Sequence, residues 1–212
     1  MRPRTGSRAI SLVALLLRRH PEVQYIRFRT YPAPSKIQRP LTPLTLARAL
    51  RHERGPELLW SVPDRGISTA LKRMLARISL ERVMVGLCSQ VETRSGTSKH
   101  ALLMDFRPQK SAGSLQTLND ACRYIGYTGW LLETTQSYHF YGDDLVGEWE
   151  WLRFMGGWLL LENLIDVRFI GHCIIERVSC LRLTGNSTWS EPRVVRRVGT
   201  GHAKPHWLVR EG

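Results

Sequence analysis

The sequence predicts an α+β protein in which helices pack on an antiparallel or mixed sheet, with a smaller α/β element at the N-terminus. Two observations support this fold class. Apolar residues make up 42% of the 212 residues and charged residues 23%, which is ordinary composition for a globular protein. From about residue 82 onward, apolar stretches typical of strands come in pairs around short polar turns, and helical stretches separate the pairs.

The first quarter of the chain is expected to hold a helix, a strand and a second helix. The helix over residues 7–19 should end at the His20–Pro21 step, because a residue before proline disfavours helical geometry. Residues 23–30 alternate between apolar and polar side chains, as a half-buried strand does. After a proline-rich connector, the Thr42–Pro43 pair is typical of the start of a helix, which we expect to continue to about residue 54.

After one more helix, the remaining sequence predicts the order hairpin, helix, hairpin, helix, helix and strand. The polar, glycine-containing turn over 93–98 indicates that the two strands around it are antiparallel. The expected elements are a helix over 68–78, strands over 82–92 and 99–106, a helix over 114–125, strands over 129–134 and 138–141, a helix from Asp143 or Asp144 to about 163, a helix over 167–176, and strands over 179–184 and 193–198.

The charge of the chain is strongly positive and uneven. Thirty-one Lys and Arg against 18 Asp and Glu give a net charge of +13. Residues 1–55 carry twelve basic residues against two acidic ones, whereas residues 143–212 carry nine of each. We therefore expect a basic N-terminal element (1–55) packed on a core (56–198), followed by a C-terminal tail (199–212). A polyanion is the expected partner: nucleic acid, a nucleotide or an acidic membrane surface.

Cysteine usage and hydropathy predict a soluble cytoplasmic protein that does not cross a membrane. The apolar run over residues 10–17 is too short to span a bilayer, and three basic or histidine residues follow it instead of a cleavage site. The cysteines form no CxxC pair, so we expect reduced thiols and neither a disulfide framework nor a zinc knuckle. The four cysteines are Cys88, Cys122, Cys173 and Cys180.

Polar residues at expected strand ends and turns are the candidates for chemistry. Asp105 ends an apolar strand, and Ser137 and His139 are two residues apart, so they face the same side of the next hairpin. Asp166 and Arg182 follow further along the chain. Each residue taken alone also has a structural explanation. Asp105 could cap a turn, His139 could be hydrogen-bonded within the core, Asp166 could be a helix N-cap, and Arg182 could be the solvent-facing residue of a strand.

Taken together, these segments resemble the archaeo-eukaryotic primase superfamily, the primase-polymerases. That family has an Asp-x-Asp/Glu motif, then Ser-x-His, then a single Asp before a Leu-Arg-Leu-Pro-Gly-like strand. Asp105 matches the first acid, Ser137-Tyr138-His139 the second motif and Asp166 the third, while Leu181–Gly185 is similar to the strand. The resemblance covers about residues 80–198 and implies an RRM-like catalytic core.

The resemblance implies a nucleotidyltransferase that builds a strand from NTPs or dNTPs on a single-stranded DNA or RNA template. Asp105 and Asp166 would be the catalytic residues that bind Mg²⁺ or Mn²⁺, because hard cations prefer carboxylate oxygens. Ser137, His139 and Arg182 would bind the incoming nucleotide through charge-assisted hydrogen bonds to its phosphates.

Three departures from the family pattern leave other functions open. Arg107 stands where the family has its second acid, and Thr188 and Ser190 stand where its tail has Asn and Lys. Glu92 or Glu133 could supply the missing carboxylate. The first alternative is a catalytically degenerate primase-fold protein that binds nucleic acid or nucleotide. The second is a basic RNA-binding or interaction protein whose Asp and His residues are structural.

Overall fold

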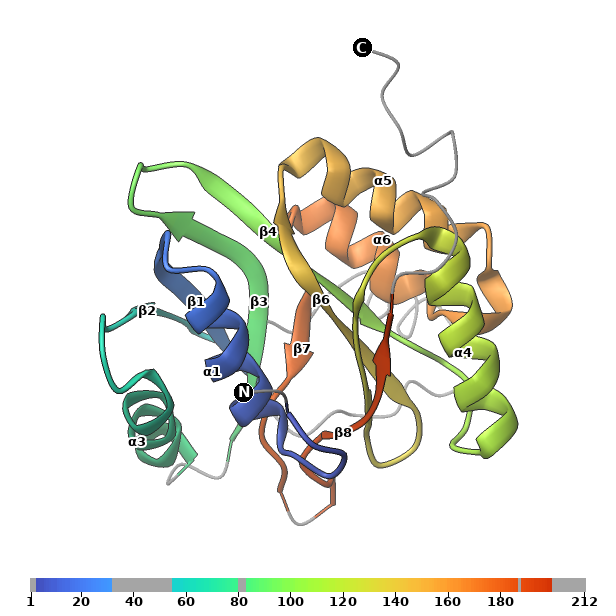
Figure 1. Ribbon diagram of the computed structural model, residues 1–212, viewed down its shortest axis with the longest axis horizontal. Coiled ribbons are helices and arrows are strands. Elements are labelled where there is room, and N and C mark those ends of the chain that lie inside the picture. Colours follow the sequence, from blue (N-terminus) through green and yellow to red (C-terminus); the bar gives the residue numbers. More distant parts are fainter. Residues whose placement is uncertain (1–2, 32–54, 80–82, 187, 200–212) are drawn as a thin grey trace, which may run out of the picture.

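Eight strands form one antiparallel sheet in the part of the chain that the structure describes (Figure 1). The structure is a computed structural model, and it describes residues 3–31, 55–79, 83–186 and 188–199. The expected helix over 43–54 and the tail beyond residue 199 lie outside the described residues. The elements are α1 (Ala9–Arg19), β1 (Val23–Tyr31), β2 (Glu57–Ser61), α3 (Ile67–Ser79), β3 (Met84–Thr93), β4 (Ser98–Asp105), α4 (Ala112–Ile125), β5 (Gly129–Glu133), β6 (Tyr138–Val146), α5 (Glu148–Leu159), the 3-10 helix η1 (Glu162–Leu164), α6 (Val167–Glu176), β7 (Cys180–Arg182) and β8 (Arg193–Val198).

The strand order is β2-β1-β3-β4-β6-β5-β8, and β7 pairs with β3. Strand β3 has β1 along one edge and divides its other edge between two partners. It pairs with β4 over Gln90–Glu92 and with β7 over Gly86–Cys88. The short strand β7 therefore lies where β3 and β4 separate, and Figure 1 shows it between the two halves of the sheet.

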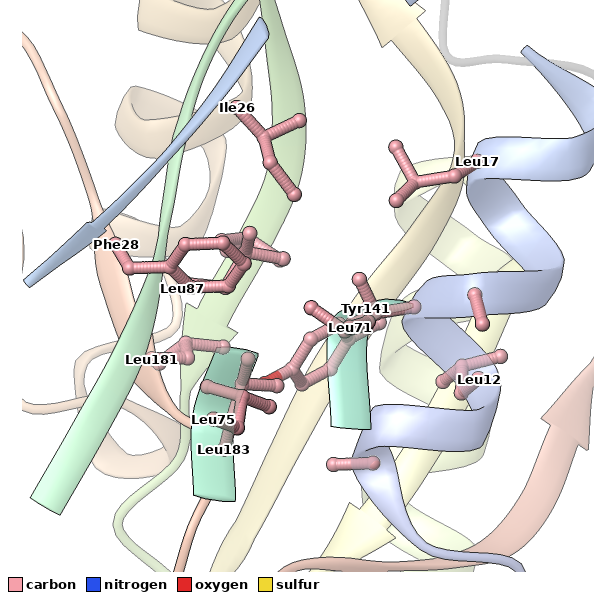
Figure 2. Packing of buried hydrophobic residues seen from close by; sticks show 14 of the residues in the cluster. Leu12, Leu17, Ile26, Phe28, Leu71, Leu75, Leu87, Tyr141, Leu181 and Leu183 are labelled. Carbon is pink, nitrogen blue, oxygen red and sulfur yellow. The ribbon is translucent and has the colours of Figure 1, made fainter. Parts of the chain in front are cut away.

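Side chains alternate between two hydrophobic cores, one on each face of the sheet. In β4, Leu103 belongs to the core that α1 and α3 cover, whereas Leu102 and Met104 belong to the core that α4, α5 and α6 cover. Figure 2 shows Leu17 of α1 and Phe28 of β1 pointing into the first core from different sides. The α+β fold class predicted from the sequence is confirmed, with one antiparallel sheet and helices on both of its faces.

The N-terminal segment completes both the sheet and the first core. Strand β1 pairs with β3 from Val23 to Tyr31, with bulges that shift the register, and α1 contributes Leu12 and Leu17 to the core. One partly buried carboxylate then ties α1 to the far half of the sheet. Asp143 of β6 forms ion pairs with Arg19 of α1, at 3.2 Å, and with Arg197 of β8.

Short-range chemistry explains where the best-defined helix begins and ends. The Ser111 hydroxyl accepts a hydrogen bond from the backbone N–H of Ser114 at 3.0 Å, which caps the first turn of α4. Gly126 ends the helix with φ at 83°, a left-handed geometry that glycine adopts with little strain. This helix confirms the sequence prediction to within two residues at its start.

One local prediction from the sequence is wrong, and one strand was not predicted. Asp143 and Asp144 do not begin a helix, because β6 continues to Val146 and α5 begins at Glu148. The Asp143 N–H donates to the Thr128 carbonyl at 3.0 Å, and its carboxylate forms ion pairs, so tertiary contacts hold this segment extended. Strand β2 was not expected, since it is an exposed edge strand without clear alternation. In the described part of the chain, no helix has the length and apolar character that crossing a membrane requires.

We expect Trp151→Ala to destabilise the protein by about 3–5 kcal/mol, as large-to-small changes in a close-packed core do. Trp151 of α5 is fully buried, and its ring stacks on His100 with a centroid distance of 4.7 Å. Trp149→Ala is the matched control, because Trp149 lies on the same helix and is 60% exposed. It should change the stability by less than about 1 kcal/mol. Urea denaturation measures both, and equal losses would contradict the assigned core.

Candidate active site

Asp105 and His139 meet at neighbouring positions of β4 and β6. The two residues are paired in the antiparallel register, and the Asp105 Oδ1 atom lies 3.5 Å from His139 Nε2. The Asp105 side chain is 38% exposed, so a ligand can reach it, whereas that of His139 is 7% exposed. Burial and the nearby Arg182 charge lower the pKa of His139 to about 3, so its imidazole is neutral at physiological pH.

Backbone contacts bring Asp166 to the same end of β4. Phe106 and Ile165 form an antiparallel bridge, and the Arg107 N–H donates to the Leu164 carbonyl at 3.0 Å. Asp166 also caps α6, because its carboxylate accepts a hydrogen bond from the Arg168 N–H at 2.9 Å. Asp166 is therefore a helix N-cap, as one explanation of the sequence proposed. It also lies close enough to Asp105 to act on it electrostatically.

The surroundings of Asp105 disfavour its charged form. Burial and then the Asp166 carboxylate raise the pKa of Asp105 to about 7, and Arg182 acts in the opposite direction. At neutral pH Asp105 is therefore partly protonated. A bound cation would stabilise its ionised form and displace that proton.

Arg182 is oriented by the loop that follows β7. Its Nη1 donates to the Ser190 carbonyl at 2.5 Å and to the Thr184 carbonyl at 3.4 Å, and the guanidinium lies 5.6 Å from the centre of the Trp189 ring. The Ser190 N–H in turn donates to the Thr135 hydroxyl at 2.8 Å, which ties this loop to the turn between β5 and β6. The charge of Arg182 acts on both Asp105 and His139.

The described hydrogen bonds of Ser137 lead away from Asp105 and His139. Its N–H donates to the Thr134 hydroxyl at 3.1 Å, and the two hydroxyl oxygens lie 3.3 Å apart. Tyr141 was not among the candidates, although its hydroxyl donates to the Arg182 carbonyl at 3.5 Å. Tyr141 lies two residues beyond His139 on β6, so the two side chains share one face of the strand. The same alternation that grouped Ser137 with His139 would therefore have added Tyr141 to the candidates.

Asp105 and Asp166 are the residues that could hold a cation. Among the described residues, no group of three His, Cys, Asp or Glu side chains could hold a metal ion. Glu92 pairs with Ser98, seven residues before Asp105 on β4 and roughly 23 Å away. Leu132 of β5 is paired with His139, and Glu133 is the next residue along the strand. The Glu133 side chain therefore lies on the opposite face of the sheet. Neither glutamate supplies the missing carboxylate.

The donor set nevertheless suits a hard divalent cation. Two neighbouring carboxylates match the way Mg²⁺ is held, since Mg²⁺ takes one or two protein carboxylates and completes its coordination with waters and substrate phosphates. Asp166 also helps to raise the pKa of Asp105, as a second carboxylate nearby does. A site with these two ligands depends on its substrate for the remaining ones.

The candidate site therefore consists of a carboxylate and a histidine on adjacent strands of an open antiparallel sheet, with a second aspartate at a helix start. A family model described as AEP-like, archaeo-eukaryotic primase 1D-like, matches residues 66–194. The match covers more than half of the chain, so the chain belongs to this family. No curated protein and no solved structure gives a significant match to the chain.

We expect Asp166→Asn to lower the pKa of Asp105 from about 7, and Arg182→Ala to raise it, because the first change removes a like charge and the second an opposite one. Carbon-13 NMR of the aspartate carboxyl groups across pH 3 to 9 measures both shifts. Asp144→Asn is the control, since Asp144 lies near the other end of β6 and should leave the Asp105 titration unchanged. If neither substitution changed the Asp105 titration, the three side chains would not lie close together.

Proposed function

We propose that this chain is a primase-polymerase-like nucleotidyltransferase that joins NTPs or dNTPs on a single-stranded nucleic acid template. The supporting observation is the meeting of Asp105, Asp166 and His139, which come from three separate segments of the chain. A purely structural role would not require a partly exposed carboxylate beside a second one. Membership of the primase-like family favours the same reaction.

Asp105 and Asp166 would hold a Mg²⁺ or Mn²⁺ ion together with the phosphates of the nucleotide. When bound, the ion supplies positive charge to the reacting phosphate and to the attacking hydroxyl. Asp105 remains reachable from solvent and binds in its ionised form. His139 is neutral and buried, so it can accept or donate one hydrogen bond without adding charge.

Arg182 would bind the triphosphate through its guanidinium charge. Trp189 and the Ser190 carbonyl already fix its orientation, so little conformational freedom is lost when the nucleotide binds. Outside the site, the net charge of +13 supports a polyanionic partner, and the basic residues of 1–55 would contact the template backbone.

A catalytically degenerate nucleotide-binding protein is the second candidate. Arg107 favours it, because it places an exposed cation where the family has a metal-binding acid. The absence of a three-residue metal cluster among the described residues points the same way. In this case the same group of charged side chains would bind nucleotide or nucleic acid without joining nucleotides.

Primer extension in Mg²⁺ or Mn²⁺ tests the proposed reaction. We expect Asp105→Ala and Asp166→Ala to reduce product at least 100-fold, because each removes half of the proposed cation site. Asp64→Ala is the matched control, since the Asp64 side chain is 82% exposed and pairs with Arg94 away from the site. It should leave the product yield unchanged.

The outcomes separate the candidate functions. Equal product from the wild type and both site variants would contradict the proposal. Nucleotide binding that weakens steeply with salt, without any product, would identify the degenerate protein instead. If neither nucleotide nor nucleic acid binds, only a basic interaction protein with structural Asp and His residues remains.

A further inference from the structure

Two cysteines are in contact beside the strand that carries Arg182. The Sγ atoms of Cys88 on β3 and Cys180 on β7 lie 3.3 Å apart, and both thiols are free. The two residues are paired in the antiparallel register. Cys122 lies elsewhere, in the core beneath α4. The sequence did not predict this contact, because 91 residues separate the two cysteines along the chain.

The hydrogen-bond pattern shows that this pair has the geometry of a cross-strand disulfide. The Ser89 N–H donates to the Ser179 carbonyl at 2.7 Å, and the Leu183 N–H donates to the Val85 carbonyl at 2.8 Å. Hydrogen-bonded and non-hydrogen-bonded pairs alternate, so Cys88 and Cys180 form a non-hydrogen-bonded pair, with Cα atoms about 4.5 Å apart. That spacing lies within the range that disulfides span, roughly 4.4–6.8 Å.

The neighbours of Cys180 leave space for its thiol and polarise it. A Cβ atom at Gly86 would lie 3.1 Å from Cys180 Sγ and 2.5 Å from the Tyr31 ring, so glycine there makes room for both groups. Tyr31 hydrogen-bonds to the Cys180 thiol, and the buried Arg29 lies close enough to act on it electrostatically. Both favour the thiolate, although burial and the Cys88 thiol raise the pKa of Cys180 more strongly.

We propose that Cys88 and Cys180 are an oxidisable dithiol that a hydroperoxide converts to a reversible disulfide, which clamps β7 and its Arg182 to β3. Cys180 is partly exposed and Cys88 is fully buried, so Cys180 reacts first. Its sulfur takes one oxygen from the hydroperoxide to form a sulfenic acid, and the remainder of the hydroperoxide leaves as an alcohol, or as water when hydrogen peroxide is the oxidant. The Cys88 sulfur then attacks that sulfur, water leaves, and the S–S bond forms. The two electrons lost by the thiols reduce the peroxide.

The clamp would act on the short strand that carries Arg182. Strand β7 has three residues, and in the described part of the chain its paired strand is β3. Forming the bond requires the sulfur atoms to approach from 3.3 Å to about 2.05 Å, a change that two facing side chains can share. The proposal does not depend on nucleotidyl transfer, because it concerns the attachment of β7 alone.

Hydrogen peroxide treatment of the full chain, followed by non-reducing peptide mapping, tests the proposal. We expect the Cys88 and Cys180 peptides to become linked, with a mass loss of about 2 Da that dithiothreitol reverses. The link closes a long loop, so the thermal midpoint of the oxidised protein should rise by roughly 5–15 °C. Cys88→Ser and Cys180→Ser should abolish both changes, whereas Cys122→Ser and Cys173→Ser should retain them.

Several results would overturn the proposal. These are a sulfinic acid on Cys180 with Cys88 still reduced, a link to Cys173, links only between copies of the chain, or no reaction. A disulfide that forms but lowers the thermal midpoint would show that the pair is strained, which also contradicts it. Peptide mapping of the wild-type protein identifies which cysteines are linked, even if a serine variant fails to fold.

Discussion

The antiparallel register between β4 and β6 is the constraint on which the candidate site depends. It sets Asp105 opposite His139, and it sets Leu103 opposite Tyr141 one step further into the sheet. A slip of one residue would turn the Asp105 side chain toward the α4, α5 and α6 core. A carboxylate there would be buried without a partner, which costs several kcal/mol. The same pairing that fills the two cores therefore also fixes the two polar residues.

The remaining parts of the site are attached to this pair through backbone contacts. The bridge between Phe106 and Ile165 places Asp166, while β7 and the loop after it place Arg182. Each attachment is short, with one bridge in the first case and a three-residue strand in the second. The rigidity of the site is therefore uneven. Asp105 and His139 lie on long central strands, whereas Asp166 and Arg182 depend on the way α6 and β7 are held.

The sequence predicted most of the fold, because its signals were local. The hairpins and most of the helices from residue 82 onward follow from alternation, polar turns and helical stretches, and the structure confirms them apart from the start of α5. The wrong prediction at Asp143 and Asp144 has one cause, which is dependence on distant partners. The ion pairs of Asp143 with Arg19 and Arg197 keep its segment in a strand, and neither arginine is near it in the sequence.

The candidate site shows the same division. Asp105, His139 and Asp166 could be found from their positions at strand ends and helix starts, combined with the resemblance to a family. The orientation of Arg182 by Trp189 and Ser190, and the contact between Cys88 and Cys180, required the sheet topology. The roles of the site residues in binding and catalysis remain predictions.

A crystal structure with Mn²⁺ and a nucleoside triphosphate would show whether Asp105 and Asp166 hold a metal ion, because manganese can be located by its anomalous scattering. We expect an anomalous peak that Asp105 and Asp166 both coordinate, with the triphosphate beside His139 and Arg182. A peak bound elsewhere, or a nucleotide that leaves both carboxylates without metal, would contradict this expectation.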